Sequence, residues 1–201
     1  MLLAFVGTCL LIELTPGPNM IYLAVVAASR GRKLAFYTVC GVALGLLIVG
    51  MATALGLAAV INASSLLYQA LRVAGVCYLL WLAWDGWRDA DAPVAEAPTD
   101  RVGLRYFRRG LITNLLNPKA AVFYVAVLPS FVTPTAPVVP QTILLSLSFV
   151  IIATVIHSTI VVLAGTASTL LQNPQRSRII RRALAVALAC VAIWFVWDTA
   201  I

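Results

Sequence analysis

Six long apolar runs constrain the fold of this chain more than any motif does. The hydrocarbon core of a bilayer, about 30 Å thick, takes about 20 helical residues to cross. Runs of that order cover residues 2–27, 36–60, 66–86, 110–132, 141–170 and 183–201. Only 10% of the 201 residues are charged, against about 25% in soluble domains. We therefore predict an all-α polytopic membrane protein with six transmembrane helices.

The basic residues predict how these helices are oriented. Most of them gather after the first, third and fifth runs: Arg30, Arg32 and Lys33; Arg88, Arg101, Arg105, Arg108 and Arg109; and Arg176, Arg178, Arg181 and Arg182. Cytoplasmic loops of membrane proteins are enriched in Lys and Arg. Loops 28–35, 88–109 and 172–182 are thus predicted to be cytoplasmic, with both termini outside. The net charge of +7 then fits an anionic lipid surface rather than a nucleic acid.

The longest polar stretch, residues 88–109, separates two halves that each hold three runs, 1–87 and 110–201. An odd number of crossings inverts the second half relative to the first. A shift of 102 positions lays Pro16 on Pro118 and Tyr22 on Tyr124. The sequence predicts two inverted three-helix repeats, joined by a cytoplasmic linker within one transmembrane domain.

The first and fourth runs carry residues that interrupt helices. The first holds Glu13, Thr15, Pro16, Gly17, Pro18 and Asn19, and the fourth holds Thr113, Asn114, Asn117, Pro118 and Lys119. Proline removes a backbone donor and kinks or breaks a helix. In hydrocarbon such backbone survives only where it is buried in protein or lines a wet cavity. Helices 1 and 4 are therefore predicted to be broken around a cavity.

Two charges lie deep in these runs. At 1.5 Å per residue, Glu13 is about 16 Å from the outer end of its helix and Lys119 about 14 Å from the cytoplasmic end. A charge at the bilayer midplane costs about 2.5 to 3.5 kcal/mol, so the two are expected to neutralise each other. A protonated Glu13 and a snorkelling Lys119 are the alternatives. Glu13, Lys119 and His157, the single histidine, are the candidates for proton coupling, although a lone histidine more often makes an ordinary helix contact.

This combination predicts a site for a small zwitterion. A helix that begins near Pro18 and Asn19 favours a carboxylate, and Glu13 favours an ammonium group. Asn114 and Asn117, three residues apart, are expected on one helical face. Broken helices with a midplane site are typical of secondary transporters. The predicted substrate-binding residues are Glu13, Thr15, Pro16, Gly17, Pro18, Asn19, Asn114, Asn117, Pro118 and Lys119.

The same residues also form recognisable motifs. The segments Leu14-Thr15-Pro16-Gly17-Pro18-Asn19 and Gly110-Leu111-Ile112-Thr113-Asn114-Leu115-Leu116-Asn117-Pro118-Lys119 resemble those of the LysE/RhtB family of amino-acid exporters. The resemblance implies efflux of amino acids or related metabolites across the bacterial inner (plasma) membrane, driven by the proton gradient or the membrane potential. The family often has an acidic residue where this chain has Asn19, which shifts the expected proton-coupling role to Glu13.

Other classes of function fit the sequence less well. The chain has no GxSxG or HExxH motif, and its four cysteines lie in four separate runs without a CxxC pair, so no enzyme activity, cofactor or bound metal is expected. An exporter of a metal cation or another metabolite, and a membrane redox protein, remain the alternatives. Gly41 and Gly45 form a GxxxG motif, which predicts close helix packing and, if exposed, a homodimer. The sequence does not specify which amino acid is carried.

Overall fold

The computed structural model describes residues 2–56, 65–88, 90, 100–133, 135–166 and 174–198, and every regular element within them is helical. The all-α prediction is therefore confirmed. The α-helices are α1 (Leu2–Leu14), α2 (Pro18–Arg30), α3 (Arg32–Ala54), α5 (Ser65–Arg88), α6 (Asp100–Leu115), α7 (Pro118–Val122), α8 (Val138–Thr166) and α9 (Pro174–Asp198). After α7 the chain continues through a π-helical turn, η2 (Phe123–Val127), and a 3-10 turn, η3 (Leu128–Phe131).

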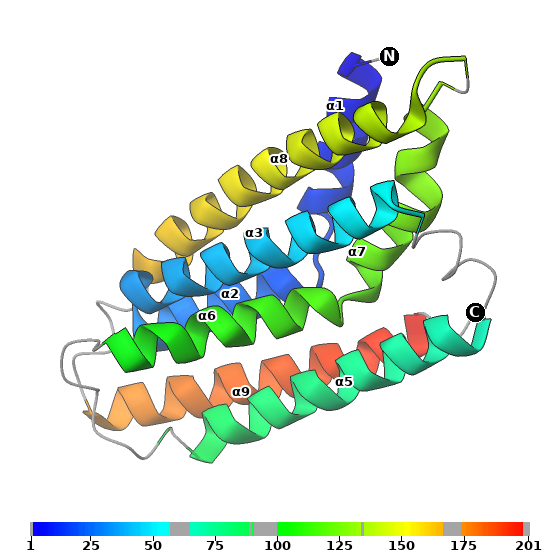
Figure 1. Cartoon of the computed structure of the whole chain (residues 1–201). Helices are drawn as coiled ribbons and strands as arrows, with labels where there is room; N and C mark the ends of the chain where they lie inside the picture. Colours follow the sequence, from blue (N-terminus) through cyan, green and yellow to red (C-terminus); the bar gives the residue numbers. More distant parts are fainter. Residues whose placement is uncertain are drawn as a thin grey trace.

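Both predicted helix breaks are present. The axis bends by 56° between α1 and α2, and by 49° between α6 and the segment Pro118–Phe131. Pro18 and Pro118 each stand at the start of the second piece, where the missing N–H would have had no intrahelical partner. These restarts are 100 positions apart, so the sequence shift of 102 does not align the two breaks. Figure 1 shows the two broken helices running in opposite directions.

Candidate membrane spans can be assigned by length and composition within the described residues. Two helices, α3 and α8, are long and apolar enough to cross a bilayer, and up to four spans result if each bent pair counts as one. Helices α5 and α9 have 24 and 25 residues, which is a sufficient length to cross a bilayer. Six spans therefore remain a prediction.

Close backbone contact holds α3 against α6 (Figure 1). A Cβ atom at Gly41 would lie 2.0 Å from the carbonyl oxygen of Phe107, and one at Gly110 would lie 2.2 Å from that of Thr38. Small residues permit such an approach between membrane helices, so the predicted packing role of the GxxxG motif is confirmed. Because Gly41 and Gly45 are buried inside the chain, the motif no longer supports a homodimer.

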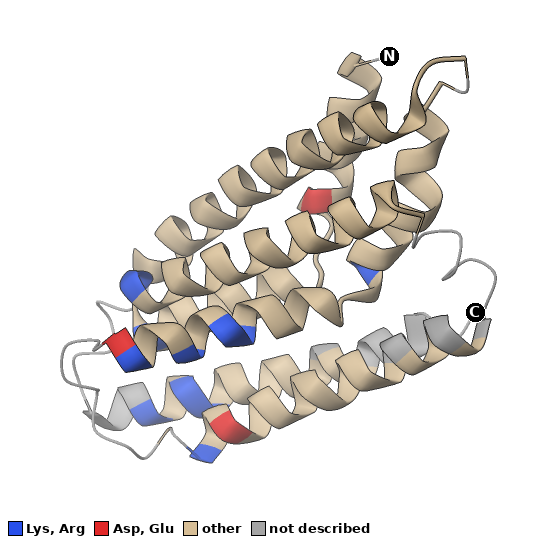
Figure 2. Ribbon diagram, viewed as in Figure 1, with Lys and Arg blue, Asp and Glu red and all other residues tan. Residues whose placement is uncertain are grey.

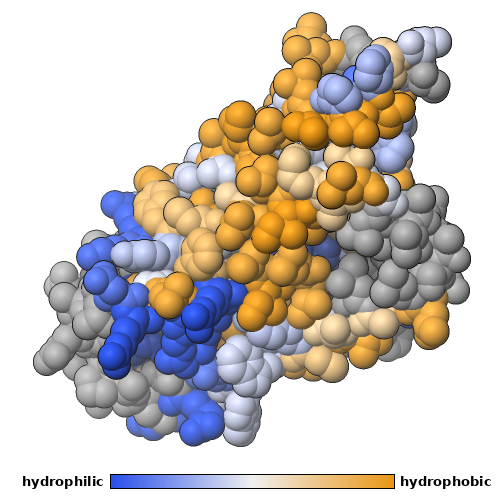
Figure 3. All heavy atoms as spheres, viewed as in Figure 1, coloured by the Kyte–Doolittle hydropathy of each residue, from blue (hydrophilic) through white to orange (hydrophobic). Residues whose placement is uncertain are grey.

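Charge and hydropathy are distributed along the long axis of the molecule. Figure 2 shows the Arg and Lys residues of the helix ends gathered at one end, which we call the basic end, while the start of α1 and the end of α9 lie at the other. Figure 3 shows the same end as hydrophilic and much of the remaining visible surface as apolar. On α8, Leu144, Ile151 and Leu163 are each more than 60% exposed. Such a surface suits contact with lipid chains.

The helices extend further into the predicted basic loops than expected. Residues 100–109, assigned to the linker, form the first part of α6, and residues 28–30, 32–35 and 174–182 are also helical. The connection between α2 and α3 is Gly31 alone, whose φ of 87° suits glycine. In α6, Gly103, Tyr106 and Gly110 are buried at spacings of three and four, which mark one helical face. Charged residues on the other face interrupt the apolar run, so the first part of α6 was not predicted as part of a membrane helix.

Candidate functional site

A polar layer separates two hydrophobic clusters in the core. One cluster, which includes Phe5, Phe123 and Phe149, lies toward the chain termini. The other, which includes Val26, Leu82 and Leu188, lies toward the basic end. The helix breaks bring buried polar side chains between them: Glu13, Asn19, Asn114, Asn117 and His157.

Glu13 lies against His157. Its Oε2 is 3.2 Å from His157 Nε2, and the side chains are only 9% and 2% exposed. The contact has the distance of an ion pair without the alignment of a hydrogen bond. The direct partner of Glu13 in the structure is thus the His157 imidazole on α8, where the sequence had led us to expect Lys119. A buried carboxylate needs such a partner.

Lys119 instead stabilises the broken backbone. Its Nζ donates a hydrogen bond to the carbonyl oxygen of Thr15, one of the carbonyls exposed where α1 ends. Its aliphatic chain lies beside Gly17, where a Cβ would come 3.0 Å from Lys119 Cδ. Lys119 thus connects the second helix break to the first, and it does not snorkel to an end of the molecule.

Two asparagines connect the broken helices a second time. Asn19 Nδ2 donates to Asn114 Oδ1 at 2.8 Å, joining α2 to α6. The other two amide atoms, Asn19 Oδ1 and Asn114 Nδ2, are buried and have no hydrogen-bond partner in the described part of the chain. Buried polar atoms are usually satisfied, so this pair presents one free acceptor and one free donor. Of the two residues, Asn19 lines a cavity together with Glu13, whereas the Asn114 amide lies against Gly45.

The two restarted helices differ at their N-termini. The Asn117 side chain accepts a hydrogen bond from the backbone N–H of Lys119 and caps α7. At the start of α2, by contrast, no side chain within the described residues caps the helix after Gly17. Asn117 therefore stands at the break, and the prediction that it shares a continuous helical face with Asn114 is wrong. The open N–H groups at the start of α2 carry partial positive charge.

A small cavity of about 10 Å³ lies at this junction, which we call the central cavity. Its lining includes six of the predicted residues: Glu13, Gly17, Asn19, Asn117, Lys119 and His157. Pro18 and Pro118 are buried as helix starts, whereas Thr15 and Pro16 are exposed, and the Thr15 hydroxyl donates to the Leu11 carbonyl of its own helix. The sequence did not identify the rest of the wall, which is formed by Ile12, Met20, Leu46, Ala120 and Phe149. At this volume the cavity holds about one water molecule, so an amino acid could bind only after the helices move.

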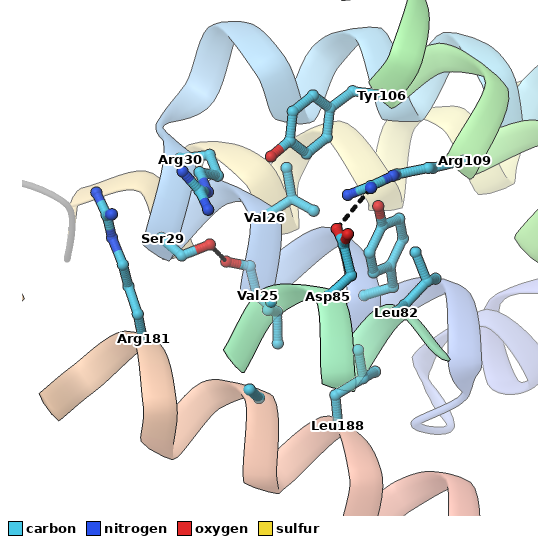
Figure 4. A pocket seen from close by; sticks show the side chains of 13 residues that line it. Val25, Val26, Ser29, Arg30, Leu82, Asp85, Tyr106, Arg109, Arg181 and Leu188 are labelled. Atoms are coloured by element: carbon cyan, nitrogen blue, oxygen red, sulfur yellow. Dashed lines mark hydrogen bonds and ion pairs between the residues drawn. The ribbon is translucent and has the colours of Figure 1, made fainter. Parts of the chain in front are cut away.

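A second pocket, of about 40 Å³, lies near the basic end between α2, α5, α6 and α9 (Figure 4). We call it the basic-end pocket. Arg109 Nη2 donates to Asp85 Oδ2 at 2.6 Å, and the Arg109 side chain is only 10% exposed. Sequence reasoning missed both residues, since Arg109 was assigned to a linker. An acid inside the predicted third run and a buried face on α6 were the signals that could have found them.

The amino-acid sequence of the chain also matches a known protein family. The family of the LysE type translocator matches residues 10–199. The chain belongs to this family. The LysE type assignment agrees with the resemblance seen in the helix-break motifs.

Relatives of this LysE type translocator carry names that describe efflux. It is 29% identical to the homoserine/homoserine lactone efflux protein of Salmonella typhimurium (strain LT2), over 90% of this chain and 88% of that protein. It is 34% identical to the threonine efflux protein of Escherichia coli (strain K12), over 59% of this chain and 60% of that protein. No solved structure gives a significant match.

The translocator offers few ligands for a metal. Among its described residues, no group of three or more His, Cys, Asp and Glu side chains could hold an ion. Cys9 is buried in α1, while Cys40, Cys77 and Cys190 are exposed on three other helices.

Proposed function

We propose that this LysE type translocator is a secondary exporter of small zwitterionic amino acids, of the size of threonine or homoserine, from the bacterial cytoplasm. The observation that carries the proposal is the contact between Glu13 and His157 at the junction of two broken helices, beside Lys119. A protein without a polar cargo would gain stability by replacing such buried charges with apolar side chains. The names of two relatives as homoserine and threonine efflux proteins support this substrate class.

The central cavity offers complementary partners for the two ends of an amino acid. The substrate carboxylate binds the open N–H groups at the start of α2, with Lys119 beside them. The substrate ammonium binds Glu13. Asn19 Oδ1 and Asn114 Nδ2, the two amide atoms with no partner in the described chain, complete the hydrogen bonds. Because the cavity is small in this conformation, binding requires the broken helices to open.

Proton coupling, in this proposal, belongs to the pair of Glu13 and His157. A proton that reaches Glu13 from outside neutralises the carboxylate and releases the substrate ammonium. His157, 3.2 Å away, exchanges that proton with Glu13 and compensates its charge in the empty state. Lys119 keeps its charge and holds the Thr15 carbonyl.

The architecture we propose has six transmembrane helices in two inverted repeats, with both termini outside. The two bends of similar size, the opposite directions of the broken helices (Figure 1) and the pairing of α5 with α9 support it. Repeats of this kind move around a fixed midplane site and expose it to either side in turn. The linker and the basic end face the cytoplasm.

The test is efflux from cells preloaded with a panel of dipeptides, which are hydrolysed to free amino acids. Cells expressing the wild type are compared with cells expressing Glu13→Gln at equal membrane abundance and with cells holding an empty vector. We expect faster release of small polar amino acids in the wild type, and at least a roughly tenfold loss of that gain in the variant. If no amino acid leaves faster although the protein is inserted, amino-acid export is wrong, and cations and other metabolites become the next panel.

A further inference from the structure

The basic-end pocket combines features that the proposed central site does not use. Figure 4 shows side chains from four helices converging there, with Arg109 from α6 pointing at Asp85 from α5. Arg30 from α2 and Arg181 from α9 complete the charged part of its lining. Asp85 is thus the one acidic side chain in this lining, beside three arginines.

Arg109 is held in a setting that favours planar recognition. Its guanidinium lies 5.3 Å from the ring of Trp81 and 5.6 Å from the ring of Tyr106. Stacking of this kind fixes the orientation of the guanidinium, which can then receive a carboxylate through two parallel hydrogen bonds. The present bond to Asp85 occupies one nitrogen, Nη2.

An unsatisfied polar atom marks the inner wall of the pocket. Tyr22 is only 3% exposed, and its hydroxyl lies against the Arg109 guanidinium without a well-aligned hydrogen bond in the described residues. Tyr22 lies three residues after Asn19 on α2, about 4.5 Å further along the axis. The backbone of Tyr22 therefore stands about one helical turn from that of Asn19, which lines the central cavity.

We propose that the basic-end pocket is a second binding site for the amino-acid carboxylate, occupied before the substrate reaches the central cavity. The carboxylate displaces Asp85 from Arg109 and accepts a hydrogen bond from Tyr22. Asp85, once released, binds the substrate ammonium. Passage by one turn along α2 then delivers the amino acid to Asn19 and Glu13. This inference rests on the proposed export function for its substrate.

Arg109 and Arg105 provide a matched pair of variants. Both contact Asp85, with Arg105 Nη2 at 3.4 Å from Oδ1, but the Arg105 side chain is 53% exposed and does not line the pocket. The experiment measures threonine transport in proteoliposomes as a function of its concentration on the side of the basic end. We expect Arg109→Gln to raise the half-saturating concentration about tenfold or more. Arg105→Gln should change it by less than about twofold.

A variant in which Asp85 and Arg109 exchange their charges can show whether Arg109 binds substrate or only stabilises the fold. The double variant Asp85→Arg with Arg109→Asp keeps an ion pair but removes the guanidinium from its place beside the rings of Trp81 and Tyr106. If Arg109 binds the carboxylate, the exchange restores the melting temperature of the purified protein without restoring the half-saturating concentration. If the exchange restores both, or if Arg109→Gln transports with an unchanged half-saturating concentration, the pair is a structural latch and the inference is wrong.

Failure of the export function can be distinguished from failure of this inference by direct binding. If the wild type transports neither threonine nor homoserine, the proposed function fails for that substrate class. Binding of butyrate and threoninol, which lack the ammonium and the carboxylate respectively, is then compared in the purified full-length wild type and in Arg109→Gln. Butyrate binding that Arg109→Gln abolishes supports the carboxylate site. Equal binding by the two proteins, or preference for threoninol, overturns it.

Discussion

At the scale of single residues, the structure around the helix breaks depends on the partner that each buried charged side chain contacts. Glu13 and Lys119 were expected to pair because both are deep in the bilayer region, yet Glu13 contacts His157 and Lys119 binds the Thr15 carbonyl. Each arrangement satisfies a group that hydrocarbon would penalise. The charges thus support the helix breaks at the same time as they form the proposed substrate site.

The first prediction concerns the Glu13 and His157 pair. His157→Gln removes the imidazole that lies 3.2 Å from Glu13, and we expect the efflux rate to fall about tenfold or more, because a group that exchanges its proton with Glu13 is lost. If the two residues act as one unit, the double variant Glu13→Gln with His157→Gln is no slower than either single variant. Initial efflux rates at equal membrane abundance measure this.

Thr15→Val is the control for that series. The Thr15 hydroxyl is exposed and donates to the Leu11 carbonyl within α1, so its loss should leave the efflux rate within about twofold of the wild type. Losses in Glu13→Gln and His157→Gln that multiply in the double variant would show two independent roles and would contradict a shared proton.

At the scale of helices, the positions of the helix breaks could be predicted from the sequence, but the side chains that contact one another across helices could not. Pro18 and Pro118 predict the breaks because a proline lacks the backbone N–H that a continuous helix needs, which is a local effect. In the structure both helices restart at these prolines. The cap formed by Asn117 and the contact of His157 with Glu13 depend on how α7 and α8 are placed, which no local pattern encodes. Asp85 and Arg109 were missed for a related reason: charged residues at a helix end look like a loop until their buried neighbours are known.

The second prediction tests the contact between α3 and α6. Gly41→Ala would place a Cβ 2.0 Å from the carbonyl oxygen of Phe107, and the helices would have to separate. Overpacking of this kind costs about 1–3 kcal/mol or more, so we expect the melting temperature of the purified protein to fall by about 5 °C.

Gly7→Ala is the matched control for this helix contact. Gly7 lies within α1, and a Cβ there would meet nothing within 4 Å in the described part of the chain. Alanine is a better helix former than glycine by about 0.5–1 kcal/mol, so stability should stay level or rise. An equal loss in Gly7→Ala and Gly41→Ala would show that the close approach of α3 and α6 is not what the substitution tests.

At the scale of the whole molecule, the two hydrophobic clusters lie on either side of the proposed central site. The aromatic cluster of Phe5, Phe123 and Phe149 seals the central cavity toward the chain termini; the rings of Phe123 and Phe149 stack with their centroids 3.6 Å apart. Toward the basic end, the core around Val26 and Leu82 contains the pocket of Asp85 and Arg109. The protein thus has polar sites at two depths along one axis, which an exporter can occupy in sequence.

The third prediction concerns the orientation of that axis. Single cysteines at Asp100, the first residue of α6, and at Ala136, just before α8, can be introduced after Cys9, Cys40, Cys77 and Cys190 are replaced by alanine. Both positions are exposed, and the starts of α6 and α8 lie at opposite ends of the molecule (Figure 1). A membrane-impermeant maleimide should label Ala136→Cys in intact cells and Asp100→Cys only after permeabilisation, because basic ends face the cytoplasm. Retained efflux in the alanine background controls for folding. Labelling of Asp100→Cys from outside would reverse the assigned orientation, and since Arg109 follows on the same helix, it would also turn the basic-end pocket into a site on the release side.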